Sequence, residues 1–210
     1  MEKTIIKTFN GGSWIYNSKE VNTIEEADIV ILPGGGDLNP ALYGHEPNGT
    51  RGWSDSTDEK QMALVNKAIN KNILVFGICR GLQLLTARNG GFLIQDVDHP
   101  SRHPVVTSEG EVYGMNSCHH QMCYPYNLPR EKYEVLAWTE QLSKEYRVDE
   151  KAVTLDFPTE ALDADGLFKE PEMIWYPETR WLGVQGHPEW SPGKPALDYI
   201  NKIIREKLNL

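Results

Sequence analysis

Three segments of this chain carry residue types that could do chemistry together. In the first, Cys79 follows an apolar run at 73–78 and precedes a helical pattern that starts at Leu82. A cysteine on such a strand-to-helix turn meets unpaired N–H groups and the positive end of a helix dipole, and both favour an anion. Such surroundings lower the pKa of a thiol from ~8.5 to roughly 3.5–7.5 and yield the nucleophilic thiolate. Cys79 is therefore a candidate covalent catalyst.

The second segment, residues 183–189, could supply a base for this thiol. His187 and Glu189 follow another apolar run. His187 could accept the thiol proton of Cys79, and Glu189 could fix the tautomer and orientation of the imidazole, as in a catalytic triad. Because the carboxyl ends of parallel strands share one edge of a sheet, these residues could meet although they lie far apart in the sequence.

The third segment could bind an oxyanion. Gly34, Gly35 and Gly36 come directly after an apolar run that ends at Pro33. Glycines let backbone N–H groups approach a ligand closely, and the N–H of Arg80 could join them in an oxyanion hole. A buried cysteine, a His-Pro-Glu loop and a glycine turn are each common alone. Their occurrence together, each after an apolar run, indicates an active site.

The elements that must position these residues predict an α/β fold. Residues 73–78 are apolar without alternation, as in a parallel strand buried on both faces. Helices are expected at 58–71, where Asp55, Ser56 or Thr57 could cap the first turn, from Leu82 to Asn89, and at 195–208. Strands are expected at 3–9, 27–33, 105–107, 111–115, 133–138, 152–157 and 182–185. The pattern predicts one domain over residues 1–210, with a mostly parallel sheet flanked by helices and a small antiparallel insertion.

The composition excludes several functions. The 210 residues carry a formal net charge of -9 without a basic cluster, so nucleic-acid binding is not expected. No apolar run approaches the ~20 residues of a membrane-spanning helix, and the N-terminus is too short and too charged for a signal peptide. Three cysteines, an odd number, argue against a disulfide framework. A reducing, cytoplasmic location is expected.

Several motifs resemble those of a known superfamily. Residues 77–83, Gly-Ile-Cys-Arg-Gly-Leu-Gln, resemble the nucleophile motif of class I glutamine amidotransferases. Residues 183–189 resemble the second motif of that superfamily, and residues 33–36 resemble its oxyanion loop. Within it, the chain is most similar to the γ-glutamyl hydrolase branch, the C26 peptidases, through residues 33–44, Arg80, 91–96 and 116–121. The resemblance covers approximately residues 28–190 and implies a flavodoxin-like, three-layer fold.

The resemblance implies a mechanism without a cofactor. Cys79 would form a γ-glutamyl thioester, His187 would activate the thiol and protonate the leaving amine, and Glu189 would orient His187. The backbone N–H groups of Gly35 and Arg80 would form the oxyanion hole. The amino and carboxylate groups of the glutamyl substrate would be bound by further residues, namely Gly36, Gln83, Ser117, His119 and Gln121.

Two enzymatic functions fit these residues. The first is a stand-alone hydrolase that converts a small-molecule γ-glutamyl amide to glutamate and an amine. The second is a glutaminase subunit that acts on glutamine and delivers ammonia to a partner synthetase, and a homodimer is an open alternative. A binding module without turnover is a third interpretation. The intact set of Cys79, His187 and Glu189 argues against it, as would labelling of Cys79 by iodoacetamide faster than of Cys118 or Cys123.

The chain departs from the branch pattern at two points. Residues 10–27 hold no full helix between the first two strands, so a neighbouring segment or a second subunit could cover that edge. Gly186 stands where an aromatic residue is common, and the smaller residue could enlarge the pocket beside the base.

The remaining polar segments are interpreted as structural. Residues 118–123 contain two cysteines and two histidines, but their spacing is irregular for zinc, so no metal site is expected and both cysteines are expected to be free thiols. The loop with His99, Arg102 and His103 is expected to be solvated, with a substrate role as the alternative. Residues 170–172, Glu-Pro-Glu, are expected to form a solvated turn.

Overall fold

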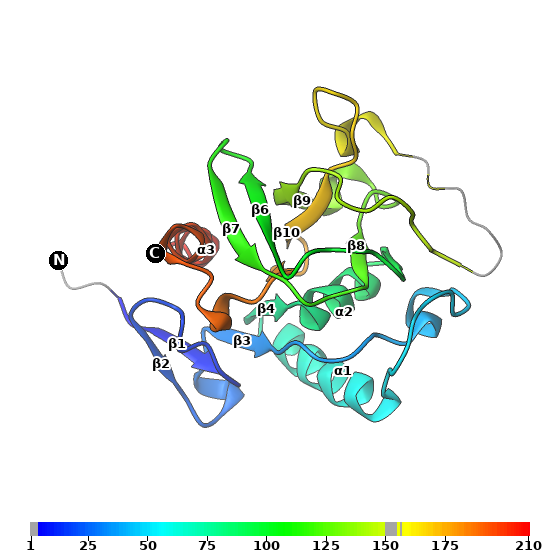
Figure 1. The fold of residues 1–210 in the computed structure, drawn as a ribbon. Coiled ribbons are helices and arrows are strands. Elements are labelled where there is room, and N and C mark those ends of the chain that lie inside the picture. Colours follow the sequence, from blue (N-terminus) through cyan, green and yellow to red (C-terminus); the bar gives the residue numbers. More distant parts are fainter. Residues whose placement is uncertain (1–3, 150–154, 156) are drawn as a thin grey trace.

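The chain folds around a large β-sheet, shown in a computed structural model that describes residues 4–149, 155 and 157–210 (Figure 1). Within these residues the sheet has nine strands, and a separate antiparallel pair is formed by β5 (Phe92–Ile94) and β8 (Met122–Tyr124). In their order across the sheet, the nine strands are β2 (Ser18–Glu20), β1 (Ile6–Phe9), β3 (Ile29–Leu32), β4 (Leu74–Ile78), β11 (Trp181–Val184), β10 (Glu170–Tyr176), β9 (Glu134–Thr139), β6 (Arg102–Thr107) and β7 (Val112–Asn116).

The two halves of the sheet differ in strand direction. β2, β1, β3, β4 and β11 are parallel to one another, whereas β10, β9, β6 and β7 continue from β11 in antiparallel pairs. β3 and β4 are buried at every position, as expected for parallel strands that are covered on both faces. The antiparallel strands predicted as an insertion therefore extend the main sheet, and the β5–β8 pair stands apart from it.

Helices cover both faces of the parallel half. α1 (Asp55–Asn70) and α2 (Arg80–Arg88) pack on one face, and α3 (Lys194–Leu208) packs on the other (Figure 1). Because successive side chains of a strand point to opposite faces, Val30 of β3 joins the core under α1 and α2, and Ile31 joins the core under α3. The predicted three-layer α/β arrangement is confirmed. In the described part of the chain, no helix has the length and apolar character needed to cross a membrane.

Most of the predicted elements are present. The strands expected at 27–33, 73–78, 133–138 and 182–185, the hairpin and the last helix correspond to β3, β4, β9, β11, β6–β7 and α3. α1 begins earlier than predicted, at Asp55, and Ser54 is its N-cap residue. The strand expected at 3–9 corresponds to β1, and Lys3 lies outside the described residues. The strand expected at 152–157 also lies outside them, apart from residues 155 and 157.

The solvated turn predicted for residues 170–172 is wrong. These residues begin β10, which is buried at all of its positions, and Glu170 and Glu172 are 0% and 2% exposed. The strand pairs with β11 on one side and with β9 on the other. Two carboxylates and a proline are not typical of a buried strand, so the sequence did not predict β10. The partners that allow the carboxylates to be buried come from distant segments.

Residues 10–28, all of which are described, form a short edge without an α-helix. Trp14 packs against Phe76 of β4 with ring centroids 5.1 Å apart. The backbone N–H of Tyr16 donates to Asn201 Oδ1 of α3 at 2.6 Å. The loop between β1 and β2, which is part of this edge, thus packs on the sheet beside α3. Cover of the edge by a neighbouring segment or a second subunit stays a prediction.

Backbone segments come into direct contact where β4 leads into α2. A Cβ atom on Gly77 would lie 2.5 Å from the carbonyl carbon of Gly81, and a Cβ atom on Gly183 would lie 2.6 Å from Gly77 O. A Cβ atom on Gly81 would collide with Leu32 O of β3. Because no side chain fits at these positions, the first turn of α2 rests on the ends of β3, β4 and β11.

Replacement of Gly77 by alanine is expected to destabilise the fold, because the added methyl group meets backbone atoms of α2. We expect a loss of about 1–3 kcal/mol in the free energy of unfolding, measured by denaturant titration. Gly114→Ala is the matched control, since its Cβ atom would meet only the flexible guanidinium of Arg102, at 2.8 Å. Equal stability of Gly77→Ala and the unaltered chain would contradict the close approach.

Candidate active site

Cys79 lies between β4 and α2, on the strand-to-helix turn predicted from the sequence. Its backbone angles are φ 48° and ψ -108°, a region that costs a non-glycine residue on the order of 1–3 kcal/mol. The N–H of Cys79 donates to Val184 O at 2.8 Å, and its carbonyl accepts from the N–H of Gln83 at 3.1 Å. These bonds hold the strained turn and place the thiol at the N-terminus of α2.

The three predicted segments meet at the carboxyl edge of the parallel strands. A Cβ atom on Gly34 would lie 2.9 Å from His187 Cε1 and 3.5 Å from Cys79 Cβ. The glycine loop follows β3, Cys79 follows β4 and His187 follows β11, and these three strands are neighbours in the sheet. The shared edge of parallel strands therefore brings together groups that are distant in the sequence.

His187 is held by contacts from three residues. Its Nδ1 lies 2.8 Å from Glu189 Oε1, its ring stacks on Trp190 with centroids 3.7 Å apart, and its backbone N–H donates to Asn116 O at 3.1 Å. Burial disfavours the charged imidazole, but the Glu189 carboxylate and the neighbouring Cys118 together outweigh burial and raise the pKa of His187. Glu189 accepts from Nδ1, and Nε2 faces Cys118.

The thiol beside His187 Nε2 belongs to Cys118, at 3.3 Å. Cys118 is exposed and also forms a hydrogen bond with the buried Cys79. That hydrogen bond and the neighbouring His187 lower the pKa of Cys118 to about 6. The same hydrogen bond, together with burial, raises the pKa of Cys79 well above its ordinary value. This arrangement was not predicted from the sequence, although Cys118 lies inside the 116–121 segment that carries the resemblance.

The side chain of Arg80 connects the glycine loop to α1. Its guanidinium is buried and contacts Asp58 and Gln61 of α1. Gln61 Nε2 donates to Pro33 O at 3.1 Å, and a Cβ atom on Gly35 would lie 3.1 Å from Arg80 Cδ. Arg80 thus joins α1, α2 and the glycine loop through its side chain, so the group it could offer to an oxyanion is its backbone N–H.

Two of the predicted substrate-binding residues hold the loops around the site. Gln83 Nε2 donates to Gln121 O at 2.7 Å. The amide of Gln121 accepts from the N–H of Leu38 at 2.8 Å and donates to Leu38 O at 3.1 Å and to Thr50 Oγ1 at 2.9 Å. The buried Ser117 Oγ has no hydrogen-bond partner within the described chain. A Cβ atom on Gly36 would lie 3.0 Å from Gly52 O. The substrate contacts expected of these residues stay predictions, namely those of Gly36, Gln83, Ser117 and Gln121.

The histidines expected on a solvated loop are buried, although Arg102 is exposed as predicted. The side chains of His99 and His103 are 0% exposed and lie beside Glu172. His119, a predicted substrate-binding residue, is directed toward the same carboxylate and pairs through Nδ1 with Gln121 O at 3.0 Å. Its contact with a substrate stays a prediction.

Gly186 does not open a pocket beside His187. A Cβ atom at this position would lie 2.8 Å from both Met115 Sδ and Asn116 O. Met115 of β7 therefore fills the space that a side chain at 186 would need. The expected enlargement is wrong because a residue distant in sequence compensates for the missing side chain.

The two active-site thiols are expected to differ in reactivity in the opposite sense to that predicted from the sequence. Iodoacetamide at neutral pH should label Cys118 first, because its pKa is about 6 and it is exposed. Cys79 and Cys123 should react slowly, since both are buried and burial helps to raise the pKa of each. Peptide mapping by mass spectrometry during a time course measures the three rates. Fastest labelling of Cys79 or Cys123 would contradict this arrangement.

Solved and curated proteins are similar to the chain in fold and sequence. A solved structure from Thermoplasma acidophilum, provisionally described as one subunit of a GMP synthase, superposes with a TM-score of 0.56 at 17% identity. The superposition covers 99% of this chain and 94% of the other, and it supports the shared fold.

Two curated relatives match parts of the sequence. A protein named as glutamine amidotransferase-like, YvdE of Lactococcus lactis subsp. lactis, is 35% identical over 124 residues. That match covers 48% of this chain and 52% of the relative, so the chain spans about half of the relative's length. The γ-glutamyl-γ-aminobutyrate hydrolase PuuD of Escherichia coli K12 is 29% identical over 198 residues, which are 84% of this chain and 70% of that enzyme. A family model, peptidase C26, matches residues 16–189, and the chain therefore belongs to the peptidase C26 family.

Proposed function

We propose that this chain is a cysteine-dependent hydrolase of small-molecule γ-glutamyl amides, which releases glutamate and an amine. The observation that carries the proposal is the convergence of the Cys79 turn, the His187–Glu189 pair and the glycine loop at one sheet edge. The relative named γ-glutamyl-γ-aminobutyrate hydrolase supports the substrate class.

The reaction proceeds through a thioester. His187 Nε2 accepts the proton of the Cys79 thiol as Sγ attacks the γ-carbonyl carbon, and the N–H groups of Gly35 and Arg80 stabilise the oxyanion. His187 gives its proton to the departing amine when the C–N bond breaks, and Glu189 holds the imidazole in place. Water, deprotonated by His187, then attacks the thioester carbon, and the products are glutamate and free Cys79.

Cys79 is the nucleophile of this proposal, and Cys118 is a positioning residue. Cys79 stands at the start of α2, beside the glycine loop, where backbone N–H groups can face the oxyanion. Cys118 lies on the loop between β7 and β8, where its Sγ contacts His187 Nε2 and it neighbours Cys79. An arriving substrate displaces the exposed Cys118 side chain, which frees His187 Nε2 to accept the proton of Cys79.

The head group of the substrate is bound beside these residues. Ser117 Oγ is buried without a partner in the described chain and can donate to a carboxylate. The glutamyl amino and carboxylate groups are assigned to four of the five residues predicted from the sequence, namely Gly36, Gln83, Ser117 and Gln121. The fifth, His119, is left out because its Nε2 is directed toward Glu172.

The proposed activity is tested with a panel of γ-glutamyl-aminobutyrate, γ-glutamyl-putrescine and glutamine, with mass-spectrometric detection of both products. We expect glutamate and the matching amine in equal amounts from at least one γ-glutamyl amine. Cys79→Ala is the inactive control. No turnover of any panel member by protein whose thiols are shown to be intact would contradict the proposal.

The roles of the two thiols are separated by Cys79→Ala and Cys118→Ala. Cys79→Ala should lose all turnover, because it removes the atom that forms the thioester. Cys118→Ala should retain turnover, and the acidic limb of its kcat/KM profile should move to lower pH, since loss of the Cys118 thiolate lowers the pKa of Cys79. Turnover by Cys79→Ala together with none by Cys118→Ala would reverse the assignment.

A glutaminase subunit is the second candidate function, favoured by the glutamine amidotransferase-like relative. The same residues would act on glutamine, and ammonia would pass to a partner synthetase. Weak glutaminase activity alone that rises when a candidate synthetase is added would favour this function. Equal rates with and without the synthetase would favour the stand-alone hydrolase.

A further inference from the structure

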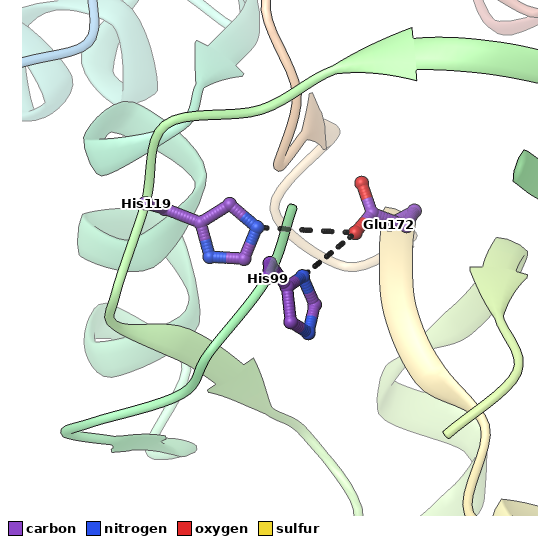
Figure 2. A group of neighbouring side chains, drawn as sticks. All are labelled: His99, His119 and Glu172. Atoms are coloured by element: carbon purple, nitrogen blue, oxygen red, sulfur yellow. Dashed lines mark ion pairs between the residues drawn. The ribbon is translucent and has the colours of Figure 1, made fainter. Parts of the chain in front are cut away.

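A buried group of side chains outside the proposed active site has the donor atoms of a metal site. His99, His119 and Glu172 point toward one another from three different segments (Figure 2). His99 follows β5, His119 lies between β7 and β8, and Glu172 belongs to β10. Their side chains are 0–2% exposed, and one ligand atom from each lies within 4.8 Å of the other two.

The hydrogen bond of His119 leaves a lone pair directed at a carboxylate. His119 Nδ1 pairs with Gln121 O at 3.0 Å, and a carbonyl only accepts, so Nδ1 carries the proton. The bare Nε2 then faces Glu172 Oε1 at 3.9 Å and has no hydrogen-bond partner among the described residues.

His99 presents a second donor in the same way. Its Nε2 lies 2.8 Å from Glu170 Oε2, and its Nδ1 lies 3.9 Å from Glu172 Oε1. A proton on Nε2, beside the Glu170 carboxylate, leaves Nδ1 bare toward Glu172.

The arrangement is unfavourable without a cation. Two imidazole lone pairs face a buried carboxylate, and Glu172 Oε2 has no hydrogen-bond partner in the described chain. A buried acceptor that meets neither a donor nor a cation is unfavourable. A divalent ion would convert the repulsion to coordination and would balance the charges of Glu170 and Glu172.

We propose that His99, His119 and Glu172 bind a divalent transition-metal ion of the Zn²⁺ type in a closed, structural site. Zinc accepts imidazole nitrogen and carboxylate oxygen at ~2.0–2.2 Å, so donors around one ion stand roughly 3.3–3.5 Å apart. The two 3.9 Å separations to Glu172 need a contraction of a few tenths of an ångström, and the separation of the two histidine nitrogens, which is within 4.8 Å, needs one of up to about 1.4 Å. The proposal replaces the expectation of no metal, which considered only residues 118–123.

The neighbours of these ligands match the surroundings of metal-bound histidines. Such histidines usually donate their second N–H to a carboxylate or a backbone carbonyl. Gln121 O takes this role for His119, and Glu170 Oε2 lies 2.8 Å from His99 Nε2, near enough to take it for His99. His103 Nε2 lies 3.1 Å from Glu172 Oε1 and orients the carboxylate, or it supplies a fourth ligand.

Metal content tests the proposal without reference to activity. Tag-free protein is dialysed against Zn²⁺, washed with a weak chelator and measured by inductively coupled plasma mass spectrometry. We expect about one equivalent per chain. The double variant Cys79→Ala, Cys118→Ala and the control His45→Gln should keep it, because neither change touches the cluster. His119→Gln and Glu172→Gln should each lose it.

Two results would overturn the site. One is the absence of retained metal in the unaltered chain, and the other is full retention in both cluster variants. If these variants do not fold, the X-ray absorption spectrum of the zinc-loaded unaltered chain decides. A nitrogen and oxygen shell with imidazole scattering supports the site, whereas sulfur ligands would place the ion on the cysteines and contradict it.

Discussion

The candidate active site depends on the contact between the first turn of α2 and the ends of three parallel strands. Gly77, Gly81 and Gly183 permit this contact because any Cβ atom there would collide with backbone. The contact sets Cys79 at a positive φ, which a local chain segment alone would not sustain. The hydrogen bond from the Cys79 N–H to Val184 O of β11 compensates for this backbone strain. The nucleophile turn is thus a property of the sheet edge as much as of its own residues.

Buried polar bonds then fix the loops around that turn. Arg80 links α2 to Asp58 and Gln61, and Gln61 reaches the glycine loop at Pro33. A buried ion pair adds little net stability, but loss of one partner leaves an uncompensated charge and is costly. Such a network therefore restricts the geometry of the loop more than it stabilises the fold.

The sequence predicts those parts of the site that follow directly from strand ends. Cys79, His187 and the glycine loop each come after an apolar run, so their shared edge follows from strand direction. The packing of Met115 into the space at Gly186 could not be predicted, because it joins β7 to a residue far along the chain. Strand β10 was not predicted for a similar reason. Glutamates such as Glu170 and Glu172 usually lie on the surface, and the histidines beside them come from a distant part of the sequence.

The loop between β7 and β8 connects the proposed catalytic residues to the buried carboxylate cluster. Asn116 O accepts from the His187 backbone, Cys118 lies beside the imidazole, and His119 turns toward the cluster. Gln121 then anchors the end of the segment to the 38–50 loop. Because adjacent Cα atoms are only ~3.8 Å apart, a displacement of His119 must move Cys118 relative to His187. Whatever holds His119 in place therefore also restricts the position of Cys118, whose low pKa depends first on Cys79 and then on His187.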